Sequence, residues 1–239
     1  MYLSSSKLKD YMNDPYYFYR KHVLHEVVFD KTPSMRIGSA VDSYLTGSPA
    51  RFRKEYVLAE RRNLKNPPEG VCELTRKEYE TAMDIIKAVS RTTVYKEIKK
   101  TFKSQVILSV DRPIGLFKGL AGIPDWFKIM DNMCTIIDLK TTSDVSEKKF
   151  YYQALDMGYY FQQAVYQMLL KKKYPELSNF KSYILAVSNT GEPYKIALFE
   201  LDQERIEMNR VKVAALIEEI SNTKDYKPQD LTWENVIKL

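Results

Sequence analysis

Apolar residues recur at alternate positions through the middle and the later part of the chain. Segments with this pattern are 104–110, 117–130, 133–140, 180–188 and 194–201. A period of two is typical of β-strands, whose side chains point alternately to opposite faces of a sheet. The sequence therefore predicts three strands and then two more, with a turn at 189–191 between the last two.

Apolar residues at helical spacing lie on either side of these strands. The expected helices span about 4–14, 33–47, 75–89, 94–100, 149–173 and 203–221. Thr32 before Pro33 is an N-cap with proline in the first turn, and Thr75 with Glu78 forms a capping box. This order of elements predicts an α/β fold with a central mixed β-sheet flanked by helices.

No repeat, low-complexity tract or strong linker interrupts the pattern. We therefore expect a single domain over 1–239, with a helical region over about 1–100 and an α/β core over about 101–221. The segment 61–70 has the proline, glycine and charge content of an exposed loop.

Composition narrows the class of protein. With 44% hydrophobic and 28% charged residues in 239, the chain is typical of a globular protein with a sizeable core. No apolar run approaches the roughly 20 residues that span a bilayer, and no signal-peptide pattern opens the chain, so a cytoplasmic protein without a membrane partner is expected. Two distant cysteines exclude a zinc ribbon or a disulfide framework. A net charge of +6 suits an acidic partner such as a phosphate backbone, although many unrelated basic proteins share it.

The hairpin predicted at 117–140 carries charged residues in an apolar setting. If Asp131 and Asn132 form a two-residue turn, Asp125 stands opposite Asp138, and Lys140 shares the face of Asp138. The β-carbons of the two aspartates would then be roughly 4.5–5.5 Å apart. Carboxylates this close repel, and a divalent cation removes the repulsion because both become its ligands.

A simpler interpretation stays open at this point. Pro124 can introduce a bulge that turns Asp125 outward and leaves both aspartates solvated. Asp-x-Lys triplets are also common, and residues 225–227 form another.

The aspartates and the lysine belong to a longer pattern. Pro124 and Asp125, followed after twelve residues by Asp138, Leu139 and Lys140, resemble the signature of the PD-(D/E)xK nucleases. With the next two threonines the segment reads "DLKTT", which resembles the phage-type and RecB-type exonuclease branch. Three more segments are similar to that branch and to CRISPR-adaptation nucleases: "FQQAVY" at 161–166, "RIGSAVDSYLTG" at 36–47 and "LSSSKLKDYMNDPYYFYRK" at 3–21.

The resemblance implies residue roles at a metal site. Asp125 and Asp138 would bind one or two Mg²⁺ or Mn²⁺ ions, with the carbonyl of Leu139, and Lys140 would orient or activate the attacking water. Asp42 stands where the family has a metal-binding histidine, although it could also be a solvated residue at the edge of its helix. Gln162 would support the site. Gln105 stands where many relatives have a glutamate, and as a neutral group it is not assigned a role. An iron–sulfur cluster, which some relatives contain, is not expected with two cysteines.

Contacts with DNA are expected around the same motif. The candidates are Thr141, Thr142, Tyr166, Lys148, Lys149, Tyr152 and Arg36. Basic and aromatic side chains together hold nucleic acid strands without reading their sequence. For Tyr166 simple packing is the alternative.

The resemblance implies a metal-dependent DNA exonuclease that acts in phage-type recombination, replication or repair, in a bacterium or a phage-infected cell. Its expected partners are DNA, as a double-stranded end or a single strand, a single-strand annealing protein or helicase, and further copies of the chain. A structure-specific endonuclease and a non-catalytic DNA-binding or helicase-associated module of the same fold are the alternatives.

Overall fold

The computed structural model describes residues 1–28, 30–59, 70–191, 193–224 and 226. The loop predicted at 61–70, apart from Gly70, and the tail that follows Tyr226 lie outside the described residues. None of the described helices is long and apolar enough to cross a lipid bilayer.

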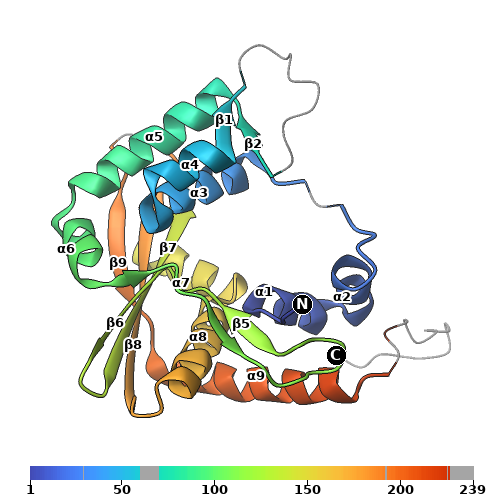
Figure 1. The fold of residues 1–239 in the computed structure, drawn as a ribbon. Helices are drawn as coiled ribbons and strands as arrows, with labels where there is room; N and C mark the ends of the chain where they lie inside the picture. The colour runs from blue at the N-terminus through green and yellow to red at the C-terminus, as the bar shows by residue number, and fades with distance from the viewer. Residues whose placement is uncertain (29, 60–69, 192, 225, 227–239) are drawn as a thin grey trace.

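A mixed sheet forms the centre of the fold (Figure 1). Within the described residues its strands, in spatial order, are β3 (Lys103–Ser104), β6 (Trp126–Met130), β7 (Met133–Thr142), β8 (Asn179–Ser188) and β9 (Ile196–Glu200). β7 and β8 run parallel, and the other neighbouring pairs are antiparallel. The prediction of an α/β fold with a central mixed sheet is confirmed. Two small sheets accompany it, β1 (Tyr56–Leu58) with β2 (Cys72–Leu74) and β4 (Leu108–Val110) with β5 (Leu120–Gly122).

Helices lie on both faces of the central sheet. They are α1 (Ser5–Asn13), α2 (Pro15–His22), α3 (Pro33–Asp42), α4 (Pro49–Glu55), α5 (Arg76–Arg91), α6 (Thr93–Thr101), α7 (Glu147–Asp156), α8 (Tyr159–Lys173) and α9 (Gln203–Asn222), together with a π-helical turn, η1 (Ser43–Gly47). In Figure 1, α3, α4 and α5 lie on one side of the sheet, and α8 and α9 lie on the other. The expected N-cap at Thr32 and the capping box of Thr75 and Glu78 are both present.

The alternation of side chains along β7 separates two hydrophobic cores. Cys134 and Ile136 pack into the core that contains α8 and α9. Ile137 and Leu139 pack into the core that contains α3 and α5. Because each step along a strand changes the face, the next residues of the first series, Asp138 and Lys140, point to the α8 side. On this face of β7, the hydrophobic series is therefore followed by two charged residues, Asp138 and Lys140.

Four predicted elements are interrupted. The strand expected over 104–110 divides into β3 and β4, and Gln105 between them has a left-handed φ of +52°. The strand expected over 117–130 divides into β5 and β6, and Pro124 lies between them. The helix expected over 149–173 divides into α7 and α8 at Gly158, whose φ of +65° is a left-handed conformation that ends a helix. The helix expected over 33–47 is α-helical only to Asp42 and continues as η1. Period and propensity alone do not locate such breaks.

A buried ion pair fastens α3 to α5. Nη2 of Arg36 lies 2.5 Å from Oε1 of Glu78, and Oε2 of Glu78 accepts the N–H of Thr75 at 2.9 Å. Glu78 is only 5% exposed. Burial raises the pKa of Glu78, but the hydrogen bonds from Arg36 and Thr75 outweigh burial and hold this pKa below its ordinary value.

Glu78→Gln should lower the free energy of unfolding by about 1–3 kcal/mol at pH 7, because it removes the charged partner of Arg36. The pKa of Glu78 is lowered on folding, so this stabilisation is complete above the unfolded pKa of about 4.3 and is lost as the pH falls through the folded value. Urea unfolding at several pH values measures the difference. Lys87→Gln, which breaks an exposed pair with Asp84, is the control and should change the free energy by less than about 0.5 kcal/mol. Equal effects of both changes would contradict the assignment.

Candidate active site

The β6–β7 hairpin has the register expected from its turn. Met130 pairs with Met133, and the turn residue Asp131 has a left-handed φ of +53°. The pairing ends at Trp126 and Ile137. Asp125 and Asp138 therefore lie one position beyond the last pair, where β7 continues without β6.

Pro124 explains why the ladder stops at this point. In the same register Pro124 would stand opposite Leu139, at a position where antiparallel partners exchange two hydrogen bonds. Proline has no N–H to offer the Leu139 carbonyl, and the N–H of Leu139 instead donates to Oδ2 of Asp125 at 2.7 Å. Both backbone groups of Leu139 therefore face Asp125, which is 9% exposed. The alternative in which Pro124 turns Asp125 outward is wrong.

Asp138 and Lys140 meet on the α8 side of β7. The ammonium of Lys140 contacts Oδ2 of Asp138 as an ion pair and lies 5.3 Å from the ring centroid of Tyr159. Asp138 is 1% exposed. Apart from this ion pair, Oδ2 of Asp138 has no hydrogen-bond donor among the described residues.

Asp42 reaches the same place from the end of α3. The hydroxyl of Thr46 in η1 lies 3.0 Å from Oδ1 of Asp42 and donates to it. Thr46 accepts from the amide of Gln105 at 2.6 Å, and Gln105 accepts from Arg51 at 2.9 Å. A chain of hydrogen bonds thus fixes Asp42 through the π-helical turn, a feature often found at functional sites.

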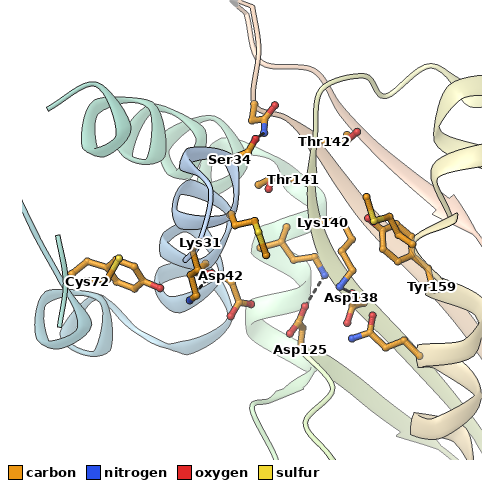
Figure 2. A pocket seen from close by; sticks show the side chains of 18 of the residues that line it. Lys31, Ser34, Asp42, Cys72, Asp125, Asp138, Lys140, Thr141, Thr142 and Tyr159 are labelled. Atoms are coloured by element: carbon orange, nitrogen blue, oxygen red, sulfur yellow. Dashed lines mark hydrogen bonds and ion pairs between the residues drawn. The ribbon is translucent and has the colours of Figure 1, made fainter. Parts of the chain in front are cut away.

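These side chains line a cavity of about 950 Å³. Figure 2 shows Asp42, Asp125 and Asp138 converging with Lys140 between α3 and β7 on one side and the residues around Tyr159 on the other. A space of this size accommodates a small ligand or a segment of a larger one.

The carboxylates interact electrostatically with one another because they are largely buried. Burial raises the pKa of Asp125 well above its ordinary value, and the charges of Asp138 and Asp42 raise it further. Burial also raises the pKa of Asp42. For Lys140, burial acts to lower the pKa, but the charges of Asp138 and Asp125 outweigh it and raise the pKa above that of an ordinary lysine. Lys140 is therefore a positively charged group beside carboxylates that repel one another. Such groups with shifted pKa values are found most often at functional sites.

The chain is similar to a known protein family. A family model described as a PDDEXK-like domain of unknown function matches residues 4–230. The chain belongs to this family. The predicted resemblance to PD-(D/E)xK nucleases is thereby confirmed.

One solved structure agrees with the PDDEXK-like assignment at the level of the fold. A crystal structure from Eubacterium rectale, named "Putative exonuclease", matches with a TM-score of 0.64 at 20% identity, over 92% of this chain and 81% of that one. The structure of SSO0001 matches with a TM-score of 0.34 at 14% identity, over 62% of this chain and 66% of that one. No curated protein matches the sequence.

PDDEXK-like folds imply a divalent cation at these carboxylates. The available donors are all oxygens, from Asp42, Asp125, Asp138 and the Leu139 carbonyl, and such a set suits Mg²⁺ or Mn²⁺. The buried Oδ2 of Asp138, without a hydrogen-bond donor, fits the same ion. As the side chains stand, no three acidic, histidine or cysteine groups in the described part of the chain are grouped tightly enough to hold a metal. Binding would therefore exchange the contact between Asp138 and Lys140 for the ion.

Thr142 lines the cavity and connects the motif to the helices. It is 3% exposed, and its hydroxyl lies 2.5 Å from Oε1 of Gln153 in α7. The amide of Gln153 in turn donates to the hydroxyl of Tyr159 at 3.1 Å. Thr142 thereby helps to hold Tyr159 near Lys140, and its contact with DNA stays a prediction. Gln153 was missed, because a single glutamine in a helix gives no sequence signal.

Gln162 and Tyr166 share a face of α8, as their spacing predicts, and the amide of Gln162 donates to the hydroxyl of Tyr166 at 2.8 Å. Gln162 lines the cavity. Tyr166 is 6% exposed and packs against Gly122, where an added Cβ would stand 3.1 Å from its ring. The Tyr166 side chain is therefore packed in the interior, which was the alternative to a DNA contact.

The other predicted DNA contacts are distributed differently. Tyr152, Lys148 and Lys149 are exposed on α7, and Lys149 pairs with Asp144. Arg36 has committed its guanidinium to Glu78 and to the carbonyl of Lys31, so it is not available to a phosphate. Thr141 lines the cavity. Residues that the sequence did not single out, and that share this lining, are Lys31, Ser34, Arg51, Gln153 and Met157.

Gly38→Ala should lower the free energy of unfolding by about 1–3 kcal/mol, because the added Cβ would stand 2.7 Å from Oγ1 of Thr141 and push α3 away from β7. In a Thr141→Ala background the obstacle is absent, and the same change should raise the free energy by up to about 1 kcal/mol through helix propensity. A double-mutant cycle by urea unfolding measures the coupling. Equal effects of Gly38→Ala in both backgrounds would contradict the contact.

Proposed function

We propose that this protein is a metal-dependent deoxyribonuclease that hydrolyses phosphodiester bonds from DNA ends. The observation that carries the proposal is the pair of buried carboxylates, Asp125 and Asp138, beside the cation of Lys140 in the cavity at the open edge of β7. Membership of the PDDEXK-like family supports a nuclease fold for this chain.

Asp42, Asp125, Asp138 and the carbonyl of Leu139 would hold one or two Mg²⁺ or Mn²⁺ ions. When bound, such an ion supplies a Lewis acid for a phosphoryl oxygen and lowers the pKa of a water. Lys140 would orient the attacking water and stabilise developing negative charge. Tyr159 fixes the direction of Lys140, and Gln162 presents an amide to the cavity.

Exonuclease action is favoured by the "DLKTT" and "FQQAVY" segments and by the name of the Eubacterium rectale protein. The proposed setting is phage-type recombination, replication or repair in the cytoplasm, with a single-strand annealing protein or a helicase and further copies of the chain as partners. The core that joins α3 and α5 to the sheet supports one nuclease domain over 1–239.

The protein should degrade end-labelled linear DNA in Mg²⁺ and leave covalently closed circular DNA intact, because an exonuclease needs an end. Gel analysis of both substrates, single- and double-stranded, with and without EDTA, measures this. Cleavage of closed circles would replace the exonuclease by an endonuclease. No metal-dependent cleavage of either substrate, or of RNA, would leave a non-catalytic module.

Asp138→Asn is the matched test of the site, since it keeps the shape and removes the charge. It should lower kcat/KM at least about 100-fold with an unchanged fold. Asp131→Asn makes the same chemical change in the turn of the same hairpin and should keep activity. Full activity of Asp138→Asn would refute the assignment.

Adding Mg²⁺ should raise the Tm of the wild-type protein, because an ion that binds only the folded state stabilises that state. At an ion concentration of 100 times the Kd, the free energy of unfolding rises by about 2.7 kcal/mol. Asp138→Asn should lose most of this shift, and EDTA should reverse it. Differential scanning calorimetry measures the shift without reference to catalysis. The same shift in both proteins would place the ion elsewhere.

A further inference from the structure

Lys9 on α1 brings a second ammonium to the edge of the candidate site. Its Nζ donates to the carbonyl of Met157 at 2.7 Å. Met157 lines the cavity and caps the C-terminal end of α7. An N-terminal helix thus reaches the segment that joins α7 to α8.

The side chain of Lys9 fits a notch that glycine leaves open. A Cβ added to Gly158 would stand 2.9 Å from Cδ of Lys9 and 3.7 Å from its Nζ. The next residue, Tyr159, places its ring 5.3 Å from the ammonium of Lys140. Lys9 and Lys140 therefore flank the short segment 157–159.

Lys9 lacks a counter-ion of its own. Asp10 pairs with Lys21 and His22, and Asp138 contacts Lys140, so within the described residues no carboxylate forms an ion pair with Lys9. Burial lowers the pKa of Lys9, the charge of Lys140 lowers it further, and the charges of Asp10 and Asp138 act in the opposite direction. Lys9 is thus within electrostatic reach of the site.

Capping α7 accounts for only part of this arrangement. A cation near a helix C-terminus is stabilising, and Lys9 makes that contact. One hydrogen bond to Met157 uses one of the three donors of an ammonium, however, and a neutral donor or water could supply it. A half-buried cation with free donors near the candidate site suits an anionic ligand.

Resting on the proposed nuclease function, we propose that Lys9 binds a phosphate next to the scissile one, so that the enzyme selects a polynucleotide strand over an isolated phosphodiester. A nucleic acid strand presents regularly spaced phosphates, and two cations on either side of 157–159 can meet two of them. Lys140 then serves the reacting phosphate, and Lys9 positions the strand.

The chain offers a matched control on the same helix. Lys7 is also half-buried, its pKa is likewise lowered by burial, and its Nζ donates to the carbonyl of Tyr2 at 2.7 Å. It differs in lacking the influence of Lys140 and Asp138. Lys9→Gln and Lys7→Gln therefore remove the same charge from the same helix, and Lys9→Arg restores the charge at the first position.

Two substrates separate strand positioning from chemistry. Lys9→Gln should lower kcat/KM on a labelled single-stranded oligonucleotide about 10- to 100-fold. On bis(p-nitrophenyl) phosphate, a diester without a neighbouring phosphate, it should stay within about 3-fold of wild type. Lys9→Arg should recover most of the loss, and Lys7→Gln should leave both activities unchanged. Equal losses on the two substrates, or none, would overturn the proposal.

Oligonucleotide binding tests the role of Lys9 independently of catalysis. By fluorescence anisotropy in Ca²⁺, Lys9→Gln should weaken oligonucleotide binding and reduce the slope of log K against log salt by about 0.7 for a single strand. Lys7→Gln should keep the wild-type slope, and matching Tm values exclude misfolding. If the wild type hydrolyses neither substrate, the nuclease function fails while the salt slope still tests Lys9. An unchanged slope in Lys9→Gln would overturn its assignment.

Discussion

Asp125 accepts the N–H of Leu139, which has no partner in β6 because the pairing of β6 with β7 ends at Trp126 and Ile137. The cause lies one residue earlier, since Pro124 would occupy the place opposite Leu139 and has no N–H to complete the pair. One missing donor therefore ends the ladder, turns both backbone groups of Leu139 toward Asp125 and opens the edge of β7. The proline and the aspartate of the motif act as a unit, in which the first removes a strand partner and the second replaces it with a carboxylate.

The open edge concentrates charge where a core would otherwise continue. Ile136 is fully buried, and two residues later Asp138 is buried to the same degree and contacts Lys140. Such a pair in a dry environment contributes little net stability, because desolvation opposes the attraction. The fold compensates with neutral contacts around it, among them the chain from Thr142 through Gln153 to Tyr159. A site that carries this strain without stabilising the fold is better explained by the ligand it binds.

Local chemistry in the sequence was sufficient for the elements and the hairpin register. The turn at Asp131, the capping box at Thr75 and the alternation along β7 each depend on near neighbours, and each was predicted. Breaks inside periodic segments were not, because the apolar pattern continues across Gly158 and Pro124 while the backbone does not. Partners distant in sequence were also missed. Arg36 pairs with Glu78, and the hydroxyl of Thr142 bonds Gln153, and neither partner is near in sequence.

An aspartate rather than a neutral group at position 42 makes the site more acidic and makes the N-terminal helices part of its chemistry. Asp42, Asp125 and Asp138 are three acidic groups, and the charge of Asp42 contributes to raising the pKa of Asp125. A neutral imidazole would not add that repulsion. Lys31, Arg51 and Lys140 line the cavity with the three carboxylates, and Lys9 adds a further cation without touching the acids. The helix that supplies Asp42 and the helix that supplies Lys9 are thus complementary: one makes the site more acidic, and the other restores attraction for a polyanion at its rim.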